Sequence, residues 1–277
     1  MAHEAAPAPA IRIERTMPKH ARRMARILNG TMEPVFAALP ESVLDNLRRP
    51  ASENALLWNL IYPLARPSLS LAQLLGLQPL WGSPVLEPQE DALSPFFWGH
   101  ALTGERLPDL DRALAEVDGK GHATQVDLFL AGARNLVLVE AKHLGSFGRC
   151  GRFARGRCPE ISPGPGGGTA PCRYWEVEPS RFSAVLDFGD RPMPEGAAPP
   201  CATHYQLART LLLGRWLAQH QASTLHVWAI IPRTRWPALQ MTWLEFVGRI
   251  RDEALWRRCR VLAWEDVRSL AEAQHPD

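Results

Sequence analysis

Two acidic residues and one lysine lie in neighbouring stretches that have the composition of β-strands. Asp127 is part of TQVDLFLA at 124–131, and Glu140 and Lys142 are part of LVLVEAKH at 136–143. Two carboxylates suit a hard divalent cation such as Mg²⁺ or Mn²⁺. Such a cation lowers the pKa of a bound water and stabilises the charge that develops at phosphorus. A lysine beside it can position or deprotonate that water, so these residues predict metal-assisted hydrolysis of a phosphate ester.

The spacing decides which face of the sheet each side chain occupies. Glu140 and Lys142 are two residues apart on one strand and therefore share a face. A connection of two residues pairs position 127 with 138, and one of four pairs it with 140. Either length puts Asp127 on the face of Glu140 and Lys142, whereas an odd length without a bulge puts it on the other. The Gly and Asn residues between the runs favour an antiparallel hairpin.

Lysine is rare in this chain, which adds weight to its position here. Only three of the 31 lysine and arginine side chains are lysines, namely Lys19, Lys120 and Lys142. A lysine pKa responds to its surroundings, whereas a guanidinium hardly ever loses its proton. The alternative is a Glu–Lys pair at a strand end with Asp127 across the hairpin. Against it, Glu140 closes a run of four aliphatic residues, and a charge at the end of a buried strand needs a reason.

The segments around the hairpin predict a mixed sheet flanked by helices. Residues 34–47 form an amphipathic pattern, and Ser52 is a good N-cap for a second helix that runs to about Tyr62. Residues 66–120 predict short helices and no clear strand. After the hairpin we expect an irregular insertion, a helix, a strand, another helix and a short strand (145–200, 203–219, 225–231, 239–256 and 261–264). This order is typical of an α/β fold.

The pattern D-(x12)-E-A-K across two adjacent strands resembles the PD-(D/E)XK nuclease superfamily of restriction and DNA-repair nucleases. The chain departs from the pattern in having Val126, not proline, before the aspartate. The resemblance implies a restriction-endonuclease-like fold over about 50–270 and cleavage of DNA, with RNA not excluded. It also implies that Asp127 and Glu140 bind the metal and that Lys142 acts near the attacking water.

Members of the superfamily often carry two accessory residues, for which this chain offers candidates. An acidic residue on a helix before the sheet would be Glu53, and a glutamine on the helix after the lysine strand would be Gln206. Each also has a structural interpretation. Glu53 would lie in a first helical turn, where the dipole favours a carboxylate. Gln206 follows Thr203 at capping-box spacing.

Arginines concentrate directly after the lysine strand. The net charge is only +2, but four arginines fall within nine positions: Arg149, Arg152, Arg155 and Arg157. Such a patch can neutralise nucleic-acid phosphates, although a solvated arginine-rich loop is the alternative. Arg209 and Tyr205, next to Gln206, are further candidates for contact with the phosphate backbone.

Four cysteines bracket the Gly/Pro-rich insertion at 145–200. We expect that Cys150, Cys158, Cys172 and Cys201 bind a structural Zn²⁺, because four thiolates suit tetrahedral zinc and a metal would help to order the segment. Their spacing lacks the close C-x2-C pairs of common zinc modules, so unrelated free thiols are the alternative. Cys259, in a helix-like stretch, is expected to be a small buried hydrophobe.

The remaining expectations concern organisation and class. Residues 1–20 are expected to form a flexible tail and 21–277 a single nuclease-like domain. No apolar run is long enough to span a bilayer, and the first residues lack the layout of a signal peptide, so we expect a cytoplasmic protein without a membrane partner. Two other functions stay open: a catalytically silent nucleic-acid- or protein-binding module on the same fold, and a zinc-stapled interaction protein. The sequence leaves the oligomeric state open.

Overall fold

The computed structural model describes residues 27–65, 69–83, 90–159, 172–178, 181–189 and 198–274. The predicted tail at 1–20 lies outside the described residues, as does part of the predicted insertion at 145–200. The boundary between tail and domain therefore stays a prediction. In the described part of the chain, no helix combines the length and the apolar character that crossing a membrane requires.

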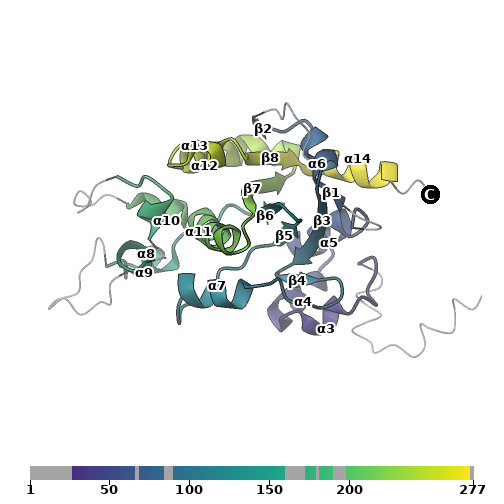
Figure 1. Cartoon of the computed structure of the whole chain (residues 1–277), viewed down its shortest axis with the longest axis horizontal. Helices are drawn as coiled ribbons and strands as arrows, with labels where there is room; N and C mark the ends of the chain where they lie inside the picture. The colour runs from purple at the N-terminus through teal and green to yellow at the C-terminus, as the bar shows by residue number, and fades with distance from the viewer. Residues whose placement is uncertain are drawn as a thin grey trace, which may run out of the picture.

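The centre of the fold is a mixed sheet of eight strands in the order β1-β3-β5-β6-β7-β8-β2, with β4 paired to β3 (Figure 1). Strand β5 is antiparallel to both of its neighbours, β3 and β6. Strand β7 is parallel to both of its neighbours, β6 and β8. The strand bounds are β1 Leu69–Ser70, β2 Trp81–Gly82, β3 Ala92–Phe97, β4 His100–Ala101, β5 Leu128–Ala131, β6 Asn135–Ala141, β7 Thr224–Ile231 and β8 Cys259–Ala263. The prediction of a mixed sheet in an α/β fold is confirmed.

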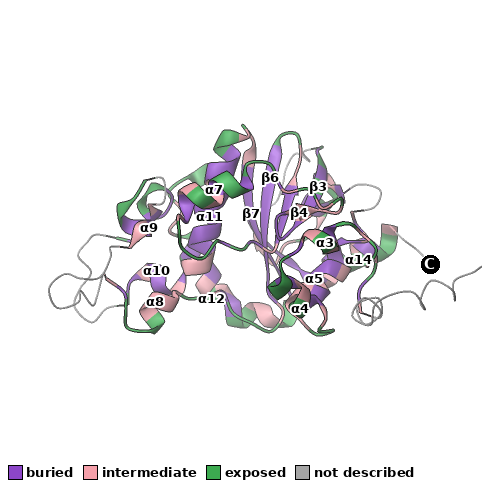
Figure 2. Ribbon diagram, turned by 90° about the horizontal axis from the view of Figure 1, so that it is seen from below, coloured by how far each residue is buried: buried purple, intermediate pink, exposed green. Residues whose placement is uncertain are grey.

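Helices cover the sheet on both sides. Their bounds are α3 Val35–Ala38, α4 Glu41–Leu47, α5 Glu53–Ile61, α6 Leu71–Gly76, α7 Leu110–Val117, α8 Gly151–Ala154, α9 Arg173–Glu176, α10 Pro200–Thr203, α11 Tyr205–His220, α12 Trp236–Val247, α13 Glu253–Trp256 and α14 Trp264–Gln274, with 3-10 turns at Phe182–Ala184 and Arg233–Arg235. Figures 1 and 2 place α7 and α11 on one side of β6 and β7, and α5 and α14 on the other.

Strand β6 is buried along its whole length (Figure 2), as its continuous aliphatic run predicted. Helix α11 lies close against it at Gly214. A Cβ added at Gly214 would lie 2.9 Å from the side chains of Leu138 and Leu225, so a larger residue would push the helix away from the sheet. This close packing fixes the position of α11 relative to the end of β6.

The N-terminal helical prediction is correct in type but wrong in continuity. The segment 34–47 forms two short helices, α3 and α4, because Pro40 disfavours a helical conformation at Leu39, whose ψ is 142°. Ser52 caps α5 as predicted, its hydroxyl accepting a hydrogen bond from the backbone N–H of Ala55 at 3.1 Å.

The expectation of no clear strand in 66–120 is wrong, because β3 is a full strand of the sheet. Its residues alternate between exposed and buried along ALSPFF, which is the period expected of a strand. Pro95 obscures the strand in the sequence, because a proline in a run argues against a central strand. In the structure, Pro95 pairs with β5, while on the other side of β3 it falls between the short partners β1 and β4.

The C-terminal predictions need three corrections. The helix expected at 239–256 is divided into α12 and α13, where the Asp252 carboxylate caps the second helix by accepting from the N–H groups of Ala254 and Leu255. The strand expected at 261–264 begins at Cys259, so this cysteine is in β8 and not in a helix; it is fully buried. Trp264 begins helix α14, which the sequence did not suggest.

The insertion is more ordered than predicted in its described parts. It carries α8, α9, a 3-10 turn and α10. Phe182 and Phe188 are buried within the same hydrophobic core as the sheet, and Tyr174 stacks on Phe182 with ring centroids 5.0 Å apart. The expectation of little apolar mass fails for these residues, because scattered aromatic side chains supply it without a periodic pattern.

A buried aspartate holds the hairpin turn between β5 and β6. The Asp91 carboxylate accepts hydrogen bonds from the backbone N–H groups of Ala133, Arg134 and Asn135 at 3.0–3.1 Å, and from the Asn135 side chain at 2.9 Å. Burial alone would raise the pKa of Asp91, but these donors outweigh it and lower the pKa below its ordinary value. Gly132 is required beside it, since an added Cβ would lie 2.4 Å from Asp91 Oδ2.

We predict that Asp91→Asn destabilises the protein by about 1–3 kcal/mol, because the amide keeps only one acceptor oxygen and turns its NH2 group towards at least one of the three backbone donors. Urea unfolding followed by circular dichroism measures the change. Asp45→Asn is the matched control, because Asp45 is 59% exposed in a surface ion pair with Arg48 and its loss is expected to cost less than about 1 kcal/mol. Equal effects of the two substitutions would contradict this role of Asp91.

The sheet also contains a histidine that is held neutral. His226 on β7 is buried, with Nε2 3.1 Å from Asn135 Oδ1, and burial together with Arg258 and Arg260 lowers its pKa from 6.5 to about 3. Below pH 6.5 the unfolded chain therefore binds a proton that the folded chain excludes. We predict that this costs up to about 1.4 kcal/mol of unfolding free energy per pH unit as the pH falls from 6.5 towards 3.

Urea midpoints measured between pH 4 and pH 8, for wild type and His226→Gln, test this prediction. We expect a less steep loss of stability below about pH 6.5 in the variant, because glutamine does not titrate. A wild-type pH slope in a folded His226→Gln protein would show that another group causes the loss.

Candidate active site

The hairpin brings Asp127 opposite Glu140. Leu128 pairs with Val139 and Ala131 with Leu136, so the connection spans four residues and the next pair outward is Asp127 with Glu140. The backbone at this pair is hydrogen-bonded on each side to residues beside a further strand. The Asp127 carbonyl accepts from Trp98 N–H at 3.1 Å beside β3, and the Lys142 N–H donates to the Ile230 carbonyl at 3.0 Å beside β7.

The three predicted side chains meet on one face of the sheet. Lys142 Nζ lies 3.8 Å from Asp127 Oδ2 and 3.9 Å from Glu140 Oε2. The Asp127 carboxylate also accepts a hydrogen bond from the Ala141 N–H at 2.9 Å, which fixes its orientation across the hairpin. Of the alternatives for the connection, the one of four residues is therefore observed, and it produces the expected juxtaposition.

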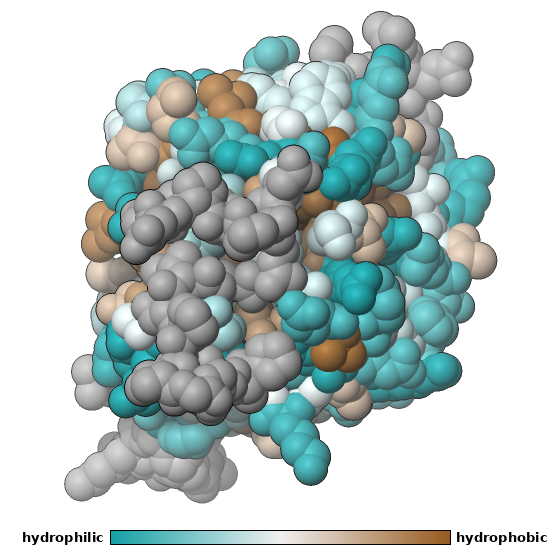
Figure 3. All heavy atoms as spheres, turned by 90° about the vertical axis from the view of Figure 1, so that its left-hand side faces the viewer, coloured by the Kyte–Doolittle hydropathy of each residue, from teal (hydrophilic) through white to brown (hydrophobic). Residues whose placement is uncertain are grey.

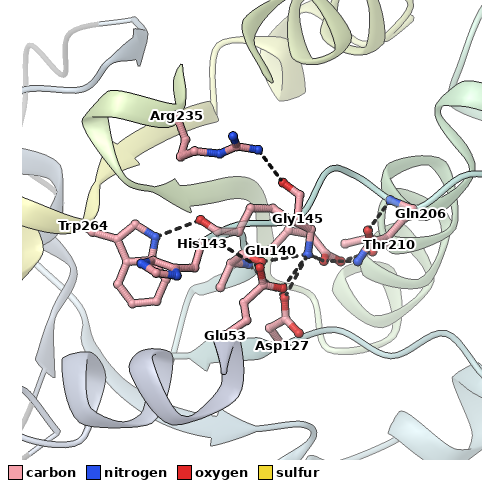
Figure 4. A network of polar contacts seen from close by, with 12 residues as sticks. Glu53, Asp127, Glu140, His143, Gly145, Gln206, Thr210, Arg235 and Trp264 are labelled. Carbon is pink, nitrogen blue, oxygen red and sulfur yellow. Dashed lines mark hydrogen bonds and ion pairs between the residues drawn. The ribbon is translucent and has the colours of Figure 1, made fainter. Parts of the chain in front are cut away.

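Glu53 reaches the same cluster from helix α5. Its Oε1 lies 3.2 Å from Lys142 Nζ, and its Oε2 accepts from the His143 backbone N–H at 2.8 Å (Figure 4). Glu53 also lies in the first turn of α5, so its favourable position at the helix dipole and its contact with the lysine coexist. Lys142 is further held by its own neighbour, because Nζ donates to the Ala141 carbonyl at 2.7 Å.

Helix α11 supplies the partners of Glu140. The Gln206 amide Nε2 donates to Glu140 Oε2 at 2.6 Å, and its Oε1 accepts from the Gly148 N–H at 2.7 Å. Thr210 donates its hydroxyl to Glu140 Oε1 at 2.6 Å. Figure 4 shows both side chains directed at Glu140 from the side opposite Glu53 and Asp127. The capping-box interpretation of Thr203 and Gln206 is not observed, because α11 has no side-chain cap.

Thr210 was missed in the sequence analysis, although a signal for it exists. It follows Gln206 by four residues, which places both side chains on one face of a helix. Trp264 and Arg235 were missed as well. Trp264 Nε1 donates to the Lys142 carbonyl at 3.0 Å, and Arg235 Nη2 donates to the Leu144 carbonyl at 2.9 Å, so both secure the chain directly after β6 (Figure 4).

The cluster contains more acidic than basic groups, and it is largely shielded from solvent. Burial, followed by repulsion from Asp127, raises the pKa of Glu140 to about 8, and burial also raises the pKa of Asp127. Burial would lower the pKa of Lys142, but the neighbouring carboxylates outweigh it and raise the pKa, so the amine is charged. Three carboxyl groups thus share one ammonium, and the site lacks positive charge.

The donor set fits a divalent cation in chemistry and in charge. A dication would balance the excess of acid, and Mg²⁺ is commonly held by one or two carboxylates together with waters. Within the described ranges, no three His, Cys, Asp or Glu side chains form a group that could hold a metal ion, and the Lys142 ammonium lies between the three acids. Asp127 and Glu140 are the two carboxylates left for such an ion. Their side chains are 14% and 0% exposed, so solvent reaches the site at Asp127.

The predicted zinc ligands do not show a coordination geometry. All five cysteines are free thiols, and in the described chain Cys150, Cys158, Cys172 and Cys201 do not form a group that could hold a metal ion. Burial raises the pKa of the Cys201 thiol to about 12, and the other three cysteines are close enough to add to that shift. Zinc binding by these four residues stays a prediction.

The arginines predicted to bind nucleic acid differ in their surroundings. Arg149, Arg155 and Arg157 are exposed and Arg152 is half-buried. Arg209, in contrast, is 9% exposed and is engaged within the protein. It lies 3.2 Å from Asp118 Oδ1, donates to the His122 carbonyl, and rests over the rings of Tyr174 and Tyr205 at 5.5 and 5.1 Å.

Comparison with families of known proteins gives a match that spans the whole sheet. A family model with the description "Restriction Endonuclease associating with ARP" matches residues 46–277. The matched range includes every residue of the cluster, from Glu53 to Thr210. No curated protein and no solved structure matches the chain.

We predict that Thr210→Val destabilises the protein by about 1–3 kcal/mol, because a buried carboxyl oxygen loses its hydroxyl partner while the side-chain shape is kept. Thermal and urea unfolding measure the effect. Thr210→Ser retains the hydroxyl and is expected to recover part of the loss. If the valine and serine variants are equally stable, the hydrogen bond to Glu140 does not contribute.

Proposed function

The chain belongs to the family described as Restriction Endonuclease associating with ARP, and we propose that it is a metal-dependent nuclease that hydrolyses phosphodiester bonds in DNA. One observation carries the proposal. The carboxylates of Asp127 and Glu140, from two paired strands, each have an oxygen within 4 Å of the Lys142 ammonium nitrogen. The site that they form lacks positive charge. A phosphodiester needs cations to offset the negative charge that builds up during its cleavage.

In this proposal, Asp127 and Glu140 hold Mg²⁺ or Mn²⁺. When bound, the ion would lower the pKa of a water, polarise the phosphate and stabilise the charge of in-line attack. Glu140 is fixed for this task from two directions, since Gln206 and Thr210 each donate to one of its oxygens at 2.6 Å. Asp127 is fixed by the Ala141 N–H and keeps a solvent-exposed part.

Lys142 acts on the attacking water and on the phosphate. Its ammonium is held by Glu53 Oε1 at 3.2 Å and by the Ala141 carbonyl at 2.7 Å, which leaves it beside the metal-binding carboxylates. From there it orients the hydroxide and screens the developing negative charge. Glu53 and Gln206 position Lys142 and Glu140 respectively, without contact with the reacting atoms.

The exposed arginines provide the electrostatic part of substrate binding. Residues 142–150 connect the end of β6 to α8 and carry Arg149, with Arg152, Arg155 and Arg157 following. Gly148 is tied to Gln206, so this segment starts at the catalytic cluster itself. A strand bound in the site would therefore find cationic side chains along its path. DNA is the proposed substrate, and RNA is the competing one.

We predict that Lys142→Ala and Asp127→Asn each reduce cleavage at least about 100-fold, because each removes a charge that stabilises the transition state. Linear, circular and single-stranded DNA, and RNA, are incubated with purified protein and Mg²⁺ or Mn²⁺, and the products are resolved on gels. Chelation with EDTA is expected to abolish cleavage, and added Mg²⁺ to restore it.

Asp111→Asn is the matched control, since Asp111 is 76% exposed in an ion pair on α7, and it is expected to cleave at the wild-type rate. Cleavage that survives Lys142→Ala would show that the site assignment is wrong. Binding of DNA by the wild type without any cleavage would favour the silent binding module instead.

A further inference from the structure

A hollow lies close to the cluster, on a neighbouring face of the first turns of α11. It has a volume of about 420 Å³ and forms where the end of α7, α8, the start of α9 and α11 meet (Figure 1). We call it the basic pocket, after the cationic side chains that line it: Lys120, Arg152, Arg155, Arg173 and Arg209, with His122 beside them. Figure 3, which faces this side of the molecule, shows that hydrophilic side chains prevail where the described residues reach the surface.

The one acid of the basic pocket is neutralised within the protein. Asp118 has a side chain that is 1% exposed and lies 3.2 Å from Arg209. Its oxygens also accept from the Tyr174 hydroxyl at 2.8 Å and from the Thr124 hydroxyl at 2.9 Å. Arg173 is likewise committed, because its guanidinium donates to the Val117 carbonyl at 2.9 Å. These contacts build the wall of the basic pocket.

Two of the pocket's cations have no side-chain partner in the described part of the chain. Lys120 and Arg155 are exposed, and neither takes part in a hydrogen bond or an ion pair through its side chain there. An ammonium and a guanidinium that face one cavity repel each other unless an anion lies between them. A phosphate group fits such a pair, since both side chains bind phosphate oxygens.

Helix α11 joins the basic pocket to the candidate active site. Gln206 and Thr210, four residues apart, contact Glu140, whereas Tyr205 and Arg209, also four apart, line the basic pocket. The two rows differ by about 100° around the helix. The two sites therefore lie on adjacent faces of one helix and are separated by at most roughly its width, about 10 Å, so one strand can reach both.

We propose that the basic pocket binds a phosphate group of the nucleic-acid strand that is held at Asp127, Glu140 and Lys142, within a few nucleotides of the bond to be cleaved. The proposal rests on the proposed nuclease function for the identity of the strand. Tyr205, half-buried in the wall of the pocket, adds an aromatic face next to the phosphate. The phosphate comes from a strand end or from within the strand, and the experiment separates these sources.

The test is binding of labelled DNA by Lys120→Ala/Arg155→Ala, measured by fluorescence anisotropy in EDTA at several salt concentrations. We expect Kd to rise at least about tenfold near 0.1 M salt, and the salt dependence of log Kd to become less steep by about 0.9, because the contact with one phosphate is lost. Both residues are exposed, so the variant is expected to fold, and circular dichroism checks this.

Arg257→Ala/Arg268→Ala is the matched control, because it removes the same charge from two surface ion pairs whose arginines are 66% and 67% exposed. This variant is expected to bind with the wild-type salt dependence. A pocket variant that binds with the wild-type slope, or a control with an equal loss, would overturn the proposal.

DNA with a 5′-phosphate, DNA with a 5′-hydroxyl and closed circular DNA distinguish the two sources. A wild-type preference for the 5′-phosphate that the pocket variant loses assigns the pocket to a strand end. Equal losses on circular and linear DNA assign it to an internal phosphate. Since binding in EDTA requires no hydrolysis, a pocket effect without any Mg²⁺-dependent cleavage would refute the nuclease proposal and leave the pocket proposal standing.

Discussion

The structure depends on one electrostatic arrangement, which is the burial of Glu140 at the end of the central strand. A carboxyl group that is fully removed from solvent is costly unless it has partners. Here Gln206 and Thr210 satisfy its two oxygens, and the Lys142 ammonium lies 3.9 Å away. Because these partners come from a position two residues further along the chain and from α11, the cluster forms only when sheet and helix are docked. The docking that stabilises the fold therefore also assembles the site.

The alignment of that cluster is set some distance from it, at the hairpin turn. Asp91 binds three consecutive backbone N–H groups there and so selects the four-residue connection. A shift of one residue in the register would turn Asp127 to the opposite face of the sheet. The carboxylate that binds the turn is thus as necessary for the site as the carboxylates within it, although it lies at the other end of the hairpin.

Helix α11 has two functions because it presents two rows of side chains. One row completes the charge cluster and the other forms a wall of the basic pocket, where Arg209 is fixed by Asp118 and by two tyrosine rings. The close contact at Gly214 with the sheet prevents the helix from rotating or withdrawing. A rigid element that borders both sites keeps a constant distance between them, which is what recognition of a strand of fixed repeat requires.

The sequence by itself determined the mixed sheet, the hairpin and the set Asp127, Glu140 and Lys142, because strand periodicity and residue chemistry are local properties. It also indicated Glu53 and Gln206 through a resemblance. Only the tertiary structure decided that β3 is a strand despite Pro95, that Thr210 and Asp91 serve the site, and that Arg209 is engaged inside the protein. Those outcomes depend on contacts between residues tens of positions apart, and the energy of such a contact is not encoded in the pattern of either segment alone.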